Sequence, residues 1–241
     1  MTKLACVTGA DRGLGFELTK QLLEQEYTVF AGKFLKEWDW LDRAVPEHGG
    51  RLIPIEMDVS DDESVKSAGK LIAEHTGKLD LLINNAGIAG GKDYEIFSEL
   101  DLGVFMKMYN VNALGPLRVT SALSHLLIAG EDKLVVNISS EAGQINQTWR
   151  ESWYGYCMSK AALNVQSNIV HNQLRSKGGR VLVIHPGWMK SYMSGKLNEN
   201  ADISAAESAG HIIHTIQQYQ SSEEISQHPA FLDYKGTAMS W

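Results

Sequence analysis

The chain has little cysteine, no linker-like segment and no long apolar run, and each shortage excludes a class of protein. Cys6 and Cys157 are the only cysteines among 241 residues, too few for a disulfide framework, which favours a reducing compartment. No Pro/Ser-rich linker or repeat interrupts the sequence, so we expect one domain over residues 1–241. No apolar stretch reaches about 18 residues, and the N-terminus lacks the shape of a signal peptide. We therefore expect a cytoplasmic protein that does not enter a membrane.

Basic residues are outnumbered, with 22 Lys and Arg against 29 Asp and Glu and a formal charge of −7. A nucleic-acid surface needs clustered Lys and Arg, so this balance excludes nucleic acid as the expected partner. The eight histidines form no Cys/His cluster in the sequence, and no metal site is predicted. We expect a small-molecule ligand.

Short apolar segments rich in β-branched residues alternate with helical segments along the chain. Most of them are too continuously apolar for an exposed sheet face, which is typical of a parallel sheet with helices on both faces. We predict an α/β fold, a single Rossmann-like doubly wound parallel sheet of about seven strands. Capping boxes at Ser60 and Ser204 mark helix starts, and the helix that contains Tyr156 should run to about Lys177. The predicted strands are Leu4–Val7, Thr28–Ala31, Leu52–Met57, Leu79–Ile83, Lys133–Ile138, Arg180–Ile184 and Phe231–Tyr234.

A glycine-rich turn, TGADRGLG, follows the first predicted strand. Glycine permits a tight turn and a close approach of backbone to a pyrophosphate, whose charge is favoured at the N-terminus of the next helix. A turn without ligand is the alternative, because short glycine patterns also occur by chance. The residues assigned to a cofactor here are Thr8, Gly9, Asp11, Arg12, Gly13, Leu14 and Gly15.

Two further segments, after the third and fourth predicted strands, support a dinucleotide site. Asp58 and Val59 stand where a carboxylate can accept from an adenine amino group, with helix capping as the alternative. Asn85, Ala86 and Gly87 stand where small and amide residues let the chain pass close to an adenosine ribose, with an ordinary turn as the alternative. The order and spacing of the three segments favour the dinucleotide interpretation.

Tyr156 and Lys160 stand four residues apart, so in a helix the phenol and the ammonium share one face. An unperturbed tyrosine, with a pKa of about 10, exchanges protons poorly near neutrality. A fixed cation would lower that pKa. The pair therefore predicts hydride-transfer chemistry in which Tyr156 donates or accepts the proton.

From Thr8 to Gly187 the chain resembles the standard-length short-chain dehydrogenase/reductase family. That family combines a TGxxxGxG turn, an NNAG stretch, a YxxxK pair and a PG turn after the sixth strand, and all four occur here in order. The segments 185–188 and 236–241 are similar to the sniffer and C-factor branch of carbonyl reductases. The resemblance implies an NAD(P)-dependent enzyme that acts on CH-OH or carbonyl groups and assembles as a homodimer or homotetramer. It implies a cofactor half in residues 1–110 and a catalytic and substrate half in residues 111–241.

The resemblance also implies the roles of four residues. Ser140 would polarise the substrate oxygen, Tyr156 would exchange the proton, Lys160 would hold the nicotinamide ribose and lower the tyrosine pKa, and Asn112 would anchor a water on the proton path. Ser139 would pack or cap. The nicotinamide would lie against a segment that contains Pro186, Gly187, Trp188, Met189 and Ser191, the last near the place of a family threonine.

The charge beside the adenosine ribose distinguishes NADP(H) from NAD(H). No acid stands at the end of the second predicted strand, where a carboxylate would repel a 2′-phosphate. Arg12 lies in the glycine-rich turn, as in similar NADP-dependent family members, and Lys33 follows the strand. Both could pair with the phosphate, so NADP(H) is the predicted cofactor. Solvated surface charge is the alternative for both residues, and NAD(H) stays open.

The interval from Ser140 to Tyr156 is 16 residues, longer than is common in the family, and indicates an insertion in residues 144–152. Tyr154 offers a competing phenol, but only Tyr156 has a lysine four residues later. Trp149 and Trp153 from this loop, with Trp188, Met189, Tyr192 and Met193, would suit an apolar carbonyl or alcohol substrate. Core packing or subunit contact is the equal alternative. Residues 194–202 are a candidate lid.

Two other functions remain open on the sequence alone. A regulatory or signalling protein could bind NADPH with little turnover, since a fold and a cofactor site do not establish activity. An assembly role for the long helix around Tyr156 could coexist with catalysis. The complete set of Ser140, Tyr156 and Lys160 favours the enzyme.

Overall fold

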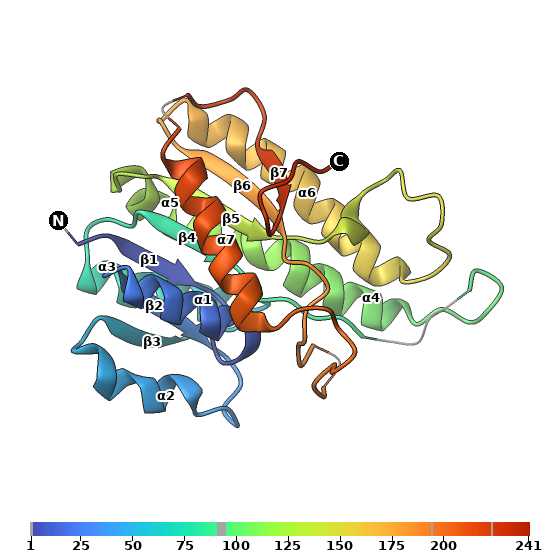
Figure 1. The fold of residues 1–241 in the computed structure, drawn as a ribbon, viewed down its shortest axis with the longest axis horizontal. Helices are drawn as coiled ribbons and strands as arrows, with labels where there is room; N and C mark the ends of the chain where they lie inside the picture. The colour runs from blue at the N-terminus through green and yellow to red at the C-terminus, as the bar shows by residue number, and fades with distance from the viewer. Residues whose placement is uncertain (1, 91–94, 194, 223) are drawn as a thin grey trace.

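A seven-stranded parallel sheet lies at the centre of the computed structural model, which describes residues 2–90, 95–193, 195–222 and 224–241 (Figure 1). Its order is β3-β2-β1-β4-β5-β6-β7, so the direction of strand addition reverses between β1 and β4. Such a reversal leaves a crevice beyond the carboxyl ends of the strands. The predicted doubly wound α/β fold is confirmed. The strands are β1 (Leu4–Val7), β2 (Thr28–Lys33), β3 (Leu52–Glu56), β4 (Leu81–Asn84), β5 (Leu134–Ile138), β6 (Arg180–His185) and β7 (Ala230–Asp233).

Helices cover both faces of the sheet, because its inner strands are apolar on both faces (Figure 1). The α1 and α7 helices cover one face, where Leu18 and Ile212 enter the same apolar cluster. The α3, α5 and α6 helices cover the other, where Ile72, Leu123 and Leu174 share a second cluster. The helices are α1 (Gly13–Glu24), α2 (Trp40–Ala44), α3 (Asp62–His75), α4 (Leu102–Tyr109), α5 (Gly115–Ala129), α6 (Tyr154–Arg175) and α7 (Ala205–Gln220), with short turns η1 (Val45–His48), η2 (Asn110–Leu114) and η3 (Glu141–Gly143).

The helix caps agree with the sequence at one predicted start and differ at another. Ser204 and Glu207 form the predicted capping box at α7. At α3 the cap is Asp61, whose carboxylate accepts from the Ser64 backbone, and the predicted box at Ser60 is wrong. The Ser60 hydroxyl instead donates a hydrogen bond to the Asp58 carboxylate, two residues earlier.

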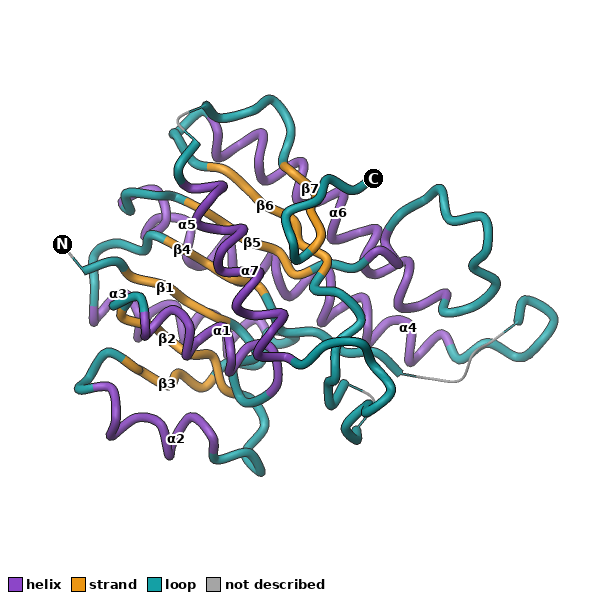
Figure 2. Tube along the Cα trace, in the orientation of Figure 1, coloured by secondary structure: helices purple, strands orange, loops and turns teal. Residues whose placement is uncertain are grey.

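Buried polar contacts tie the long helix α6 to strand β5. The Asn137 side-chain amide donates to the Ser167 hydroxyl at 2.8 Å, and the Asn84 side chain on β4 donates to the side-chain oxygen of Asn137 at 2.8 Å. Ser139, just after β5, donates to the Asn164 side chain at 2.6 Å. These contacts hold the middle of α6 beside the carboxyl end of β5. The loops that leave this edge of the sheet lie around it (Figure 2).

Candidate functional site

The glycine-rich turn packs so closely that side chains are excluded at two of its positions. A Cβ on Gly15 would lie 2.1 Å from the Gly9 carbonyl oxygen, and one on Gly9 would lie 2.8 Å from the Ala86 Cα. Gly13 has φ +55° and open space around it, where α1 begins without a side-chain cap. An uncapped helix N-terminus that faces open space is a favourable place for a phosphate group. The residues present therefore fit the pyrophosphate of a dinucleotide.

Thr8 and Asn85 fasten this turn to the segment after β4. The Thr8 hydroxyl accepts from the Asn85 and Ala86 backbone, both at 3.0 Å, and the Asn85 amide donates to the carbonyls of Thr8 and Gly9. The side chains of Thr8 and Asn85 therefore hold the glycine-rich turn and the segment after β4 together. Ala86 and Gly87 are half-buried beside this turn.

Two acids assigned to the cofactor have their carboxylates bound to the protein itself. Asp11 is buried and accepts from the backbone of Phe34 at 2.8 Å and Leu35 at 2.9 Å, and burial raises its pKa while these bonds oppose the rise. Asp58 Oδ1 accepts from both the backbone and the hydroxyl of Ser60. Asp11 thus fixes the loop after β2, and Asp58 shapes the turn before α3.

The two basic residues predicted to bind a 2′-phosphate are held differently. The Lys33 ammonium forms an ion pair with Asp42 on α2. The Arg12 guanidinium lies 5.0 Å from the centre of the Trp38 ring and 5.4 Å from that of Tyr192. A phosphate partner at this place is therefore better supplied by Arg12 than by Lys33.

Lys160 is buried in α6, and its ammonium donates to the Ile138 carbonyl at the end of β5, 2.9 Å away. Burial lowers its pKa to about 8, because the charged form loses its hydration. The ammonium lies 5.7 Å from the centre of the Tyr156 ring. The predicted pair therefore shares one face of the helix.

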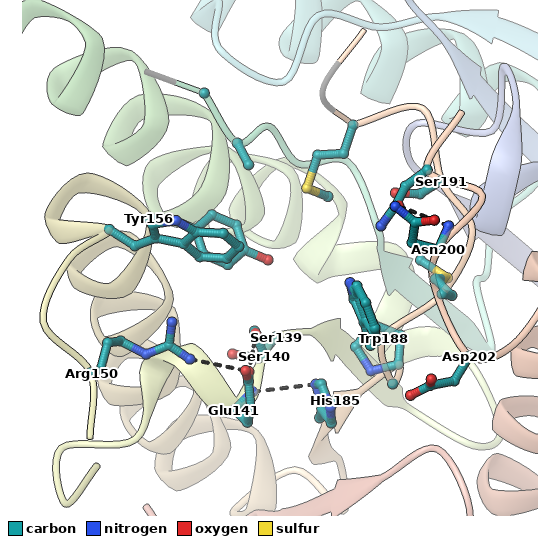
Figure 3. Close-up of a pocket in the computed structure, with 18 of the residues that line it drawn as sticks. Ser139, Ser140, Glu141, Arg150, Tyr156, His185, Trp188, Ser191, Asn200 and Asp202 are labelled. Carbon is teal, nitrogen blue, oxygen red and sulfur yellow. Dashed lines mark hydrogen bonds and ion pairs between the residues drawn. The ribbon is translucent and has the colours of Figure 1, made fainter. Parts of the chain in front are cut away.

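The predicted lowering of the Tyr156 pKa is not what the structure shows. Burial raises the pKa of this phenol to about 12, while a hydrogen bond with Ser140 and the charge of Arg150 pull it down. Lys160 does not dominate, because its ammonium is directed to the Ile138 carbonyl. Figure 3 shows the Tyr156 hydroxyl pointing into the cavity.

The two serines after β5 have different surroundings. Ser139 is buried and bonded to Asn164, which agrees with the packing role expected of it. The Ser140 hydroxyl accepts from the Ala142 backbone at 3.1 Å and donates to a carboxylate oxygen of Glu141 at 2.7 Å. Only Ser140 turns its hydroxyl toward the side of Tyr156.

Asn112 lies in the π-helical turn η2 and is fully buried. Its amide donates to the Ile88 carbonyl at 2.8 Å and to the Ser159 hydroxyl at 3.0 Å, and its carbonyl oxygen accepts from the Ile88 backbone. Ser159 in turn donates to the Tyr156 carbonyl. The Asn112 side chain thus links the segment after β4 to the first turn of α6.

The sequence analysis missed a charged cluster beside Ser140. Glu141 pairs with Arg150 of the inserted loop at 3.0 Å, and its backbone N–H donates to Nδ1 of His185 (Figure 3). Because Nδ1 accepts this hydrogen bond, the ring carries its hydrogen on Nε2, and burial lowers the pKa of His185. The position of Glu141 directly after Ser140 was a usable signal. The place of Arg150 provided no such signal, because the conformation of an inserted loop cannot be predicted from residue spacing.

A cleft of about 1470 Å³ opens beside these residues, larger than the roughly 300–1,000 Å³ of common small-ligand pockets. Its lining includes Trp188, Met189 and Ser191, three of the residues assigned to the nicotinamide end. Gly187, with φ +79°, also lines it, and a Cβ there would lie 2.9 Å from the Tyr234 ring. The predicted aromatic and apolar lining is present in Trp149, Trp153 and Met193.

Tyr192 was expected in this crevice and packs elsewhere. Its ring contacts Trp38 at 4.9 Å between centroids and lies beside Arg12, so it ties the loop after β6 to the loop after β2. Residue 194, the first of the candidate lid, lies outside the described residues, while Asn198 and Asn200 of that segment line the cleft. The sequence pattern could not distinguish an aromatic in the crevice from one that packs between loops.

Residues 3–202 match the family model described as short chain dehydrogenase. The chain belongs to this short-chain dehydrogenase family. The match covers most of the chain, and the prediction of an NAD(P)-dependent short-chain dehydrogenase/reductase acting on CH-OH or carbonyl groups is confirmed at the level of the family.

Relatives of this short-chain dehydrogenase include the C-signal protein of Myxococcus xanthus, 33% identical over 166 residues, which are 69% of this chain and 95% of the relative. The structure is also similar to NADPH-bound carbonyl reductase from chicken fatty liver, with 29% identity, a TM-score of 0.87 and coverage of 100% and 99% of the two chains. Carbonyl reductase Sniffer of D. melanogaster gives 26% identity and a TM-score of 0.88, with both chains covered in full. The predicted resemblance to the sniffer and C-factor branch is confirmed.

Two other kinds of site are absent from the described part of the chain. No described helix is long and apolar enough to cross a membrane. Within the same residues, no group of three or more His, Cys, Asp or Glu side chains is placed to hold a metal ion.

The depressed pKa of Lys160 predicts a pH-dependent stability difference. Between pH 8 and about 10.5 the unfolded chain binds this proton more strongly than the folded chain, so raising the pH stabilises the wild type relative to Lys160→Met. Urea unfolding of both proteins at pH 7, 8, 9 and 10 should show this, with Lys70→Met as the control for loss of an exposed lysine. The free energy of unfolding of the wild type minus that of Lys160→Met is the quantity to compare. If it does not change with pH, the burial of a charged amine is contradicted.

Proposed function

We propose that the protein is an NADP(H)-dependent carbonyl reductase that reduces small, largely apolar aldehydes or ketones and can run in the alcohol-oxidising direction. The observation that carries the proposal is the convergence of Ser140, Tyr156 and Lys160 at the carboxyl end of β5, beside a glycine turn shaped for a pyrophosphate. The likeness to NADPH-bound carbonyl reductase over both chains supports it. Turnover of a panel of aldehydes, ketones and quinones, followed by NADPH absorbance with purified protein, tests it.

The chain's own residues account for the proton and the charge. When bound, NADPH supplies the hydride that reaches the carbonyl carbon. Negative charge then develops on the carbonyl oxygen, and hydroxyl donors held at that point stabilise the transition state more than the ground state. Ser140 and Tyr156 are the donors, and Tyr156 gives up its proton to the oxygen. The charge of Arg150 favours the resulting phenolate. Lys160, 5.7 Å from the Tyr156 ring, would hold the nicotinamide ribose, and Asn112 keeps the first turn of α6 in place.

The cofactor half, residues 1–110, contains the glycine turn and the residues that close over the adenosine end. Arg12 is the proposed partner of a 2′-phosphate, since Lys33 is already paired with Asp42. The likeness to the NADPH-bound carbonyl reductase from chicken fatty liver supports NADP(H) as the cofactor. The catalytic and substrate half, residues 111–241, contributes Ser140, Tyr156 and the cleft lining.

The aromatic and apolar residues of the cleft support an apolar substrate. Trp149, Trp153 and Trp188 line it together with Phe105 and Met193. Large exposed rings beside reactive hydroxyls bind the apolar part of a carbonyl compound by burial of its surface. We propose a cytoplasmic enzyme that assembles as a homodimer or homotetramer, with its exposed helices α4 and α6 as contacts.

Tyr156→Phe should remove nearly all reductase turnover while the cofactor still binds, because the general acid is lost. Tyr154→Phe is the matched control, and it should keep substantial activity since Tyr154 has no lysine one turn later. Steady-state turnover and fluorescence titration with NADPH measure the two effects. The reverse order of the two variants would show that the insertion has shifted the register of the site.

Ser140→Ala should lower kcat by about a hundredfold or more, as removal of one preorganised donor does elsewhere. Ser139→Ala should instead lower the free energy of unfolding by about 1–3 kcal/mol, because the buried Asn164 carbonyl oxygen loses its donor. Measurements of kcat and of urea unfolding on both variants separate the effects. A larger loss of kcat in Ser139→Ala would refute the assignment.

Arg12→Ala should erode the preference for NADPH and leave NADH binding nearly unchanged. A charge-assisted bond to a 2′-phosphate is worth about 1.5–3 kcal/mol, so the wild type should bind NADPH about tenfold or more tightly. Fluorescence titration with both cofactors measures the ratio, and Lys33→Ala is the matched control because its ammonium is paired with Asp42. Equal wild-type affinities for the two cofactors would be incompatible with the proposed cofactor.

A further inference from the structure

The hydroxyl hydrogen of Ser140 is already engaged. Ser140 donates it to Oε2 of Glu141 at 2.7 Å, and the other carboxylate oxygen, Oε1, is paired with Arg150 at 3.0 Å. A serine hydroxyl has one hydrogen to donate. When Ser140 turns that hydrogen to a substrate carbonyl, Glu141 Oε2 therefore loses its donor.

The carboxylate is held beside Ser140 by its ion pair with the inserted loop. Arg150 holds Glu141 from the inserted loop, and the Arg150 guanidinium is itself fixed by Gln147 at 2.7 Å and stacked 4.4 Å from the centre of the Trp149 ring. The Glu141 side chain is 34% exposed and lines the cleft. A ligand that fills the cleft displaces the water that could otherwise donate to this oxygen, so a ligand that supplies its own donor is favoured.

A ligand with two oxygens fits this pair of groups. The Ser140 and Glu141 oxygens are one hydrogen-bond length apart, and so are the carbonyl oxygen of a ketone and a hydroxyl on the neighbouring carbon, at about 2.7–2.8 Å. Ser140 then donates to the carbonyl oxygen while Glu141 Oε2 accepts from the neighbouring hydroxyl. Arg150 neutralises the carboxylate, which limits its repulsion of the charge that develops on the carbonyl oxygen.

We propose that the substrates are ketones with a hydroxyl group on the carbon next to the carbonyl, and that Glu141, oriented by Arg150, is the residue that selects them. This inference rests on the proposed reductase function and deepens it. The ketone carbon gains a hydride from the bound cofactor, its oxygen gains the Tyr156 proton, and the neighbouring hydroxyl is unchanged. The product is the vicinal diol, and the oxidised cofactor balances the two electrons.

Two ketones of nearly equal shape test the inference, namely hydroxymethyl phenyl ketone and ethyl phenyl ketone, in which a methyl group replaces the hydroxyl. We expect kcat/KM for the hydroxy ketone to exceed that for the ethyl ketone by at least about tenfold in the wild type. Glu141→Gln should reduce this ratio, since a neutral amide accepts more weakly, and Glu141→Leu should abolish it. Glu151→Gln removes a carboxylate from the same loop and should keep the ratio.

Calorimetry gives a readout that does not depend on turnover. Both ketones are titrated in the Tyr156→Phe background saturated with NADP⁺, which can neither reduce the ketone nor, without the proton acceptor, oxidise its hydroxyl. We expect tighter binding of the hydroxy ketone with Glu141 intact and with Glu151→Gln only. Equal binding of the two ketones in this background and equal kcat/KM in the wild type would overturn the inference and leave the reductase function standing. Selective binding that Glu141→Gln weakens, without turnover of any carbonyl in the panel, would support the recognition and overturn the reductase function. A ratio that Glu141→Gln and Glu141→Leu leave unchanged would also overturn the role of Glu141.

Discussion

The contact between the start of α6 and the end of β5 is the constraint on which the rest of the site depends. Lys160 reaches the Ile138 carbonyl, and Asn164 binds the Ser139 hydroxyl one turn later. Each of these groups is buried, so each would cost free energy if the helix moved away and left it unpaired. The helix therefore cannot slide along the strand, and Tyr156 stays beside Ser140 although the connecting loop is longer than usual.

The same constraint explains why burial dominates the titration of the site. Fixing Lys160 against β5 removes its ammonium from water, which lowers its pKa to about 8. The half-buried Tyr156 phenol is partly desolvated by the wall that the helix forms with the loop, which raises its pKa to about 12. Both shifts favour the neutral groups. A ligand that brings charge into the cleft would shift the pKa values of both groups again. Ligand binding and proton transfer are therefore coupled.

The inserted loop contributes chemistry as well as length. It returns to α6 through Trp153, whose backbone has φ +68°, and places Arg150 against Glu141. Trp149 and Trp153 flank the guanidinium, so charge and aromatic surface arrive at the reacting centre together. At the other end of the crevice Arg12 has similar aromatic neighbours, Trp38 and Tyr192, which come from different loops. Aromatic rings thus lie beside both arginines, Arg12 at the proposed phosphate end and Arg150 next to Glu141.

The sequence by itself determined the alternation of strands and helices, the glycine turn and the helical spacing of Tyr156 and Lys160, because each depends on local residue order and periodicity. Only the tertiary structure decided which partners the polar groups take. Lys160 bonds a backbone carbonyl and leaves the Tyr156 pKa high, Lys33 pairs with Asp42, and Glu141 holds the Ser140 hydroxyl. These pairings join residues whose distance in space is set by how whole elements pack, and that distance is not encoded in any local pattern.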